Sequence, residues 1–122
     1  MRLDPSGSAR LELYGRHKHV AEQIGEHNLS RSWEIVVYFY SALHLLQAFL
    51  MTKNYRPQTH ADREQALCRL TELRSAREPY QALSWASTEA RYTSKNFSVD
   101  HVDEAKKQYA EFERELLALL GP

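Results

Sequence analysis

The side chains in this sequence best suited to chemistry are histidines and arginines that stand close to tyrosines. A histidine near its ordinary pKa of about 6.5 exchanges protons at neutral pH, and an arginine can hold a phosphate group through charge-assisted hydrogen bonds. We predict one ligand-binding pocket that such residues line, with His44, His60 and Arg91 as the candidates for catalysis. The six predicted lining residues are Tyr40, His44, His60, Arg63, Arg91 and Tyr92.

A structural role is the alternative explanation of the polar residues in the most apolar segment. His44 and Gln47 both lie there, and a buried polar group without a partner costs about 1–3 kcal/mol. A hydrogen-bond network in the core, or a seam between two copies of the protein, would satisfy both side chains. These interpretations stay open beside the pocket.

The spacing of the other candidate ligands argues against a metal site. His17 and His19 diverge on a helix, His60 and Asp62 are only two residues apart, and the sequence has no HExxH motif and no paired cysteines. We therefore predict no metal and no cofactor. The basic run at residues 16–19 is expected to be a solvated surface, and Cys68 is expected to be a core thiol.

The segment from Ser32 to Thr52 must be the element that positions these residues. Its apolar side chains recur at helical spacing and cover well over half of a helix circumference, so it must be packed on more than one side. The pattern continues too long for a strand. Glu34, His44 and Gln47 argue against a membrane span, because each is costly in lipid. We expect a central helix of a bundle.

The other segments are expected to form partner helices. The first runs from about residue 9 to 27 with Ser8 as a cap, and the third begins after Thr59 in a capping-box pattern. Pro79 is expected to separate that helix from a fourth, at about residues 80–92, or to bend a single helix. Ser98 should cap the last helix, which Gly121 ends.

Composition limits the classes of protein that fit this sequence. The 122 residues suit one domain, which we place at residues 8–122 behind a flexible lead-in at residues 1–7. Sixteen Lys plus Arg balance sixteen Asp plus Glu, so no global field draws the chain to nucleic acid or an anionic membrane. One cysteine and the lack of a signal segment favour a cytoplasmic location. The few glycines and prolines favour an all-α class.

Three groups of residues together are similar to a known superfamily. Residues 39–44, FYSALH, with Ala48 belong to the central helix, and Thr59-His60 with Arg63 open the next. Residues 80–83, YQAL, then Ser87 and residues 90–92, ARY, follow in order. Over about residues 30–120 the chain resembles the HEPN superfamily, small all-α bundles of prokaryotic nucleotide-binding and RNA-cleaving systems.

The resemblance implies an up-and-down bundle of four to five helices, usually dimeric. Roles in the family run from metal-independent RNase toxins to inactive partners of nucleotidyltransferases. The nuclease members carry an arginine that a polar residue directly follows. Between this arginine and a histidine stand four to six residues, and both typically lie on a late helix. Here Arg91 is followed by His101 too late, and the one formal match, Arg10 to His17, lies in the first helix with Leu11 after the arginine.

These observations lead to one main hypothesis and two alternatives. The main hypothesis is a homodimeric HEPN-like binding or accessory module that binds RNA or a nucleotide and no membrane. Its protein partner would be a nucleotidyltransferase of a toxin–antitoxin or defence system. The first alternative is a metal-independent RNase toxin with a non-standard His/Arg site. The second is a purely structural helical assembly protein.

Overall fold

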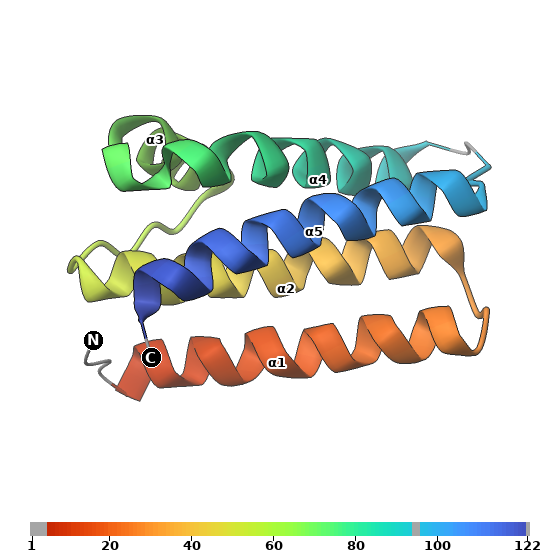
Figure 1. The fold of residues 1–122 in the computed structure, drawn as a ribbon, viewed down its shortest axis with the longest axis horizontal. Helices are drawn as coiled ribbons and strands as arrows, with labels where there is room; N and C mark the ends of the chain where they lie inside the picture. Colours follow the sequence, from red (N-terminus) through yellow and green to blue (C-terminus); the bar gives the residue numbers. More distant parts are fainter. Residues whose placement is uncertain (1–4, 94–95, 122) are drawn as a thin grey trace.

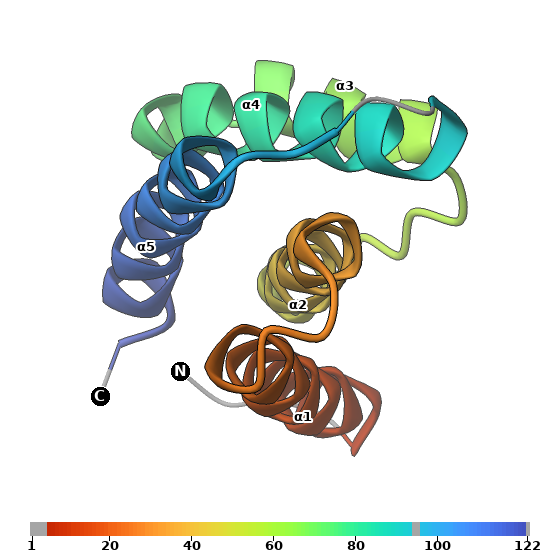
Figure 2. The same cartoon turned by 90° about the vertical axis from the view of Figure 1, so that its right-hand side faces the viewer.

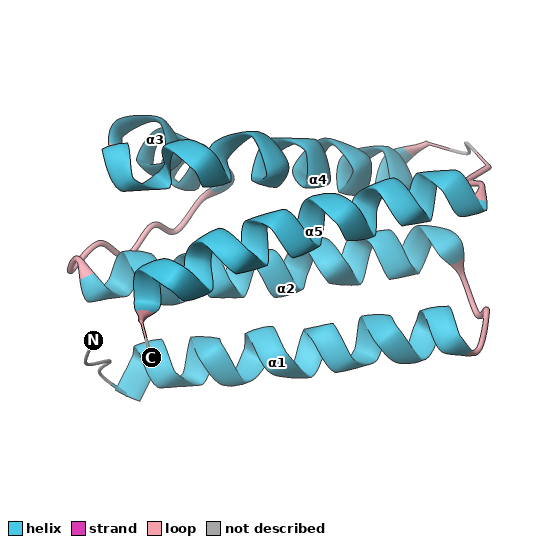
Figure 3. Ribbon diagram, in the orientation of Figure 1, coloured by secondary structure: helices cyan, strands magenta, loops and turns pink. Residues whose placement is uncertain are grey.

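The structure is a computed structural model that describes residues 5–93 and 96–121. The regular elements in this part of the chain are all helices, without a strand, which confirms the predicted all-α class. The elements are α1 (Pro5–Glu26), α2 (Arg31–Thr52), α3 (His60–Arg69), a 3₁₀ turn η1 (Thr71–Leu73), α4 (Arg74–Tyr92) and α5 (Val99–Leu120). Figure 3 shows these helices and the short loops that join them.

The four long helices lie side by side, and consecutive ones run in alternating directions (Figure 1). Seen end-on, α2 lies in the centre, with α1 and α4 on opposite sides and α5 against a third side (Figure 2). The short α3 lies beside the first half of α4. One side of α2, between α1 and the α3–α4 pair, is therefore covered by no long helix.

α2 is central because its side chains are apolar nearly all the way round. Its fully buried residues include Leu46 and Phe49, each 0% exposed, and burying one such side chain stabilises the fold by about 1.5–3 kcal/mol. α2 is also the one helix among the described residues that is long and apolar enough to cross a membrane, but 72% of its apolar window is buried inside the bundle. Core helices of bundles pass the same test, so this is weak evidence for a membrane span.

Side-chain caps confirm the predicted helix starts at Thr59 and Ser98, and a third cap, Ser30, begins α2. The Ser30 hydroxyl accepts a hydrogen bond from the Trp33 N–H at the start of α2, and the Thr59 hydroxyl accepts one from the Asp62 N–H at the start of α3. Ser98 caps α5 and forms a reciprocal capping box with His101. Each cap satisfies an N–H group that the helix itself leaves without a partner.

The first helix starts earlier than expected. α1 begins at Pro5, so residues 5–7 are helical, whereas we expected a flexible lead-in up to residue 7. Proline suits the first turn because its missing N–H has no acceptor there and its φ angle is already helical. The first four residues of the predicted lead-in lie outside the described part of the chain.

The prediction that Pro79 separates two helices is wrong. α4 continues through Pro79, which is buried, and the break lies at Leu70, whose backbone is extended. Pro79 follows the first turn of α4 closely, so its ring costs one helical hydrogen bond and packs in the core. The Arg77 side chain donates hydrogen bonds to the carbonyls of Leu67 and Cys68, and thereby caps the C-terminal end of α3.

Candidate functional site

His44 lies at the centre of a group of basic side chains from α1 and α2. Arg10 Nη1 donates a hydrogen bond to His44 Nδ1 at 3.0 Å. The ring of His17 lies against that of His44, with 4.8 Å between the centroids. A guanidinium can only donate, so His44 Nδ1 carries a lone pair and the neutral ring holds its proton on Nε2.

The electrostatic environment of His44 disfavours its positive charge. Burial is the largest cause that lowers its pKa to about 4, followed by His17, Arg10 and Arg63. His44 is therefore neutral at pH 7. The three side chains that act on it are cationic or become so on protonation, which makes this region attractive to an anion.

Arg63 and Tyr80 bring buried donors without acceptors close to this group. Arg63 Nε and the Tyr80 hydroxyl are both buried and lack a hydrogen bond of good geometry with the described residues, although the two side chains interact with each other. Burial raises the pKa of Tyr80 and Arg63 opposes the rise, so the two side chains are neighbours and the phenol stays protonated. Unsatisfied buried polar groups are rare in folded proteins, and an anion would supply the missing acceptors.

Tyr40, Arg91 and Tyr92 form a second group, one helical turn along α2 from His44. Arg91 Nη1 donates a hydrogen bond to the Tyr40 hydroxyl at 3.1 Å. The Arg91 guanidinium lies 5.7 Å from the centroid of the Tyr40 ring and 5.1 Å from that of Tyr92, which are cation–π distances. Beside them Trp33, 60% exposed, helps to line a cavity of about 220 Å³.

His60 is not brought together with the other predicted residues. Its ring is exposed and its Nε2 lies 3.6 Å from a carboxylate oxygen of Glu64, in the same turn of α3. Glu64 also accepts a hydrogen bond from Gln81. Of the predicted pocket, the structure thus places Tyr40, Arg91 and Tyr92 in one group and His44 near Arg63 in another.

The sequence marks Arg10 and His17 as the one formal match to the arginine–histidine spacing, but it did not predict that both contact His44. Arg10 and His17 are seven residues apart, two turns of a helix, so they lie on one side of α1 and both reach His44. The expectation of a solvated run at residues 16–19 is accordingly wrong for His17, whereas Lys18 stays partly exposed and pairs with Glu113, its Nζ 2.8 Å from Oε2. Cys68 is exposed, so it is not the core thiol that we predicted.

Within residues 5–93 and 96–121, no group of three or more His, Cys, Asp or Glu side chains is placed to hold a metal ion. The side chains gathered around His44 and Tyr40 are arginine, imidazole and phenol groups. Comparisons with protein-family models and with curated proteins found no match to this chain.

Proposed function

We propose that the protein is a HEPN-like helical binding module that holds a phosphate group of a nucleotide or RNA at the Arg10–His17–His44–Arg63 group. The observation that carries the proposal is the position of His44 beside Arg10 and His17, with Arg63 close enough for its charge to act on the same ring. A phosphate there would offset the positive charges that lower the pKa of His44, and it would accept the unpaired Arg63 and Tyr80 donors.

The neighbouring aromatic group suits the rest of such a ligand. Nucleobases stack on aromatic and arginine side chains without needing a specific sequence. Tyr92 is 75% exposed, its ring centroid lies 5.1 Å from the Arg91 guanidinium, and Arg91 lines one cavity with the exposed Trp33. A nucleotide with its phosphate at His44 would place its base or the next nucleotide toward these rings.

The proposal includes assembly as a homodimer beside a nucleotidyltransferase in a toxin–antitoxin or defence system, as the HEPN resemblance implies. The uncovered side of α2 supports a protein partner there. Trp and Tyr are enriched in protein interfaces, and Trp33 and Tyr92 are both largely exposed.

Equilibrium binding of a fluorescent RNA oligonucleotide and of ATP, each at fixed low salt, tests the phosphate site. We expect Arg10→Gln to weaken binding about 10- to 100-fold, since a hydrogen bond to a charged group contributes about 1.5–3 kcal/mol. Arg114→Gln removes the same charge from an exposed position on α5 and should leave the affinity within about twofold. Equal losses in the two variants would show that only the overall charge matters, and would contradict the site.

The neighbouring imidazoles of His17 and His44 favour a second candidate function, a metal-independent RNase. His44, neutral at pH 7, would accept the proton of a ribose 2′-hydroxyl at Nδ1 once Arg10 turned from this nitrogen to the phosphate. His17 would donate a proton to the leaving 5′-oxygen, and Arg10 would stabilise the charge on the phosphate. The test is incubation of purified, metal-free protein with labelled total RNA and tRNA, beside His44→Ala. Cleavage by the native protein alone would establish this function.

Binding without cleavage would leave the binding module as the function. The purely structural alternative predicts a different result, namely a dimer that His44→Ala destabilises while neither RNA nor nucleotide binds to the native protein. Sedimentation equilibrium of the native protein and of His44→Ala, run beside the binding titrations, distinguishes these outcomes.

A further inference from the structure

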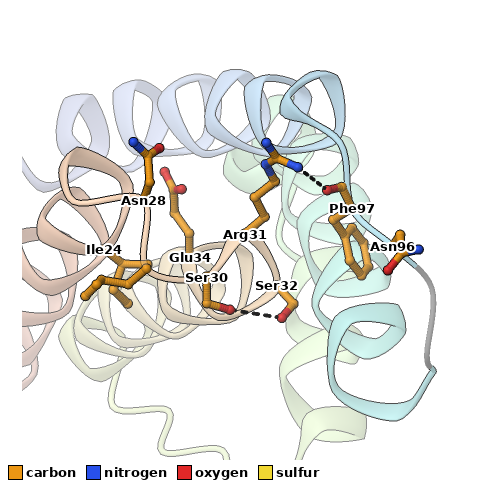
Figure 4. A pocket seen from close by; sticks show the side chains of 9 residues that line it. Ile24, Asn28, Ser30, Arg31, Ser32, Glu34, Asn96 and Phe97 are labelled. Carbon is orange, nitrogen blue, oxygen red and sulfur yellow. Dashed lines mark hydrogen bonds between the residues drawn. The ribbon is translucent and has the colours of Figure 1, made fainter.

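A buried carboxylate without a partner lies near the opposite end of α2 from the basic group. Glu34 is only 5% exposed. No hydrogen bond or ion pair to its carboxylate is present among residues 5–93 and 96–121, although its backbone N–H bonds normally to Ser30. Figure 4 shows the carboxylate extending into the space between the side chains of Asn28 and Arg31.

Two adjoining cavities open at this carboxylate. Their volumes are about 410 and 450 Å³, and Asn28, Arg31 and Glu34 line both. The first lies at the α1–α2 turn and is closed on its far side by Asn96 and Phe97. The second lies between the end of α1 and the start of α5. Volumes of this size fall in the range of sites for small molecules.

The second cavity carries more negative than positive charge. Four carboxylates line it, against the two cationic side chains Arg31 and Lys106. Arg31 is also directed elsewhere, because its Nη1 donates to the Phe97 carbonyl at 3.2 Å. The carboxylates are those of Glu22, Glu26, Glu34 and Asp103.

The backbone of α1 holds the Glu34 carboxylate in place. A Cβ atom on Gly25 would lie 2.5 Å from Glu34 Oε2, closer than any non-bonded contact allows. The carboxylate thus rests on the one position in that turn that has no side chain. Burial raises the pKa of Glu34, Lys106 opposes the rise and Asp103 adds to it. This is the behaviour of a carboxylate whose burial outweighs the effect of the nearby cation.

We propose that this cavity binds an aliphatic amine, with the primary ammonium group of the ligand paired to the Glu34 carboxylate. An ammonium supplies the positive charge and the three donors that Glu34 lacks. The further carboxylates of Glu22, Glu26 and Asp103 suit a second ammonium of the same molecule, so a diamine or polyamine fits better than a monoamine. The described residues offer no cluster that would hold a metal ion instead.

The site is independent of the proposed phosphate site. Glu34 and His44 are ten residues apart on α2, about 15 Å along a helix. The two regions also differ in the sign of their charge, because His44 is surrounded by basic side chains and Glu34 by an excess of carboxylates. Failure of one proposal therefore says nothing about the other.

Titration of the full chain with spermidine and with butylamine, followed by amide NMR shifts at constant ionic strength, tests the proposal. We expect saturable spermidine binding with the largest shifts around Gly25, Asn28 and Glu34, and weaker butylamine binding. Glu34→Gln keeps the shape of the side chain and should weaken spermidine binding at least tenfold. Gly25→Ala keeps the charge but displaces the carboxylate, and should also weaken it.

Glu12→Gln is the matched control, since Glu12 is an exposed carboxylate elsewhere on α1. This variant should bind spermidine as the native protein does. Both test variants should fold, because Glu34→Gln removes an unpaired buried charge and Gly25→Ala favours a helix. Undiminished binding by Glu34→Gln would overturn the proposal. So would equal losses in Glu34→Gln and Glu12→Gln, or equally effective competition by Mg²⁺, since both indicate diffuse attraction.

Discussion

Replacement of His44 by glutamine should change how the stability of the protein depends on pH. Glutamine keeps an acceptor for Arg10 but does not titrate in this range. The pKa of His44 in the folded protein is lowered to about 4 from 6.5. In the unfolded chain the His44 imidazole therefore binds a proton below about pH 6.5, whereas in the folded protein it binds this proton only below about pH 4. His44 thus contributes stability above pH 6.5 that is lost as the pH falls toward 4.

The magnitude follows from the difference between the two pKa values. A lowering from 6.5 to about 4 corresponds to at most about 3.4 kcal/mol of unfolding free energy. His44 is only half-buried, and solvent screening reduces such contributions, so we expect about 1–2 kcal/mol. Between pH 7.5 and pH 4.0 the unfolding free energy of the native protein should fall by this amount more than that of His44→Gln.

Urea unfolding followed by circular dichroism at pH 7.5, 6.0, 5.0 and 4.0 measures this difference. His60→Gln is the control, because His60 is exposed, and its pH dependence should follow that of the native protein closely. Parallel curves for native protein and His44→Gln would refute the reasoning. An NMR titration of the native protein in which the His44 ring protonates near pH 6.5 would refute it as well.

Three further predictions concern the fold. Leu46→Ala should lower the unfolding free energy by about 2–5 kcal/mol in urea titrations, because Leu46 is fully buried in the core; a loss below 1 kcal/mol would contradict its central place. Ser98→Ala should cost about 1 kcal/mol and speed amide hydrogen exchange in the first turn of α5, where the serine hydroxyl accepts the His101 N–H. Arg77→Met should cost about 1–2 kcal/mol and loosen the end of α3, whose carbonyls Arg77 binds; unchanged hydrogen exchange there would show that the cap is unimportant.

The sequence predicts the helices well where the signal is local. Length and apolar periodicity identify α2, and Ser30, Thr59 and Ser98 mark helix starts because a side-chain cap acts within three residues. The prediction at Pro79 was wrong because the lost helical hydrogen bond is outweighed by contacts with residues far away in the sequence. The Pro79 ring is buried, and Arg77 satisfies the end of α3 from the next helix. Such compensation depends on tertiary packing.

The candidate site was predictable only in part for the same reason. Tyr40 and Arg91 meet because α2 and α4 pack together, as the bundle prediction requires. The contact of Arg10 with His44 joins residues 34 positions apart, and nothing in the local pattern of α1 indicates which of its sides turns toward α2. Glu34 gave no signal at all, because an acidic residue in the first turn of a helix is expected there to offset the helix dipole.

The burial of α2 accounts for both charged sites. It also explains why the overall composition of the chain does not indicate them. A polar residue on a helix packed on three sides must find its partners on neighbouring helices. His44 finds basic side chains, and Glu34 finds a cavity with an excess of carboxylates. Charges of both signs are thus separated along one helix, although the net charge of the chain is zero. Glu34→Gln should therefore leave RNA and nucleotide binding unchanged, and His44→Gln should leave spermidine binding unchanged. If either variant altered both ligands, the two ends of α2 would be coupled and the assignment of separate sites would fail.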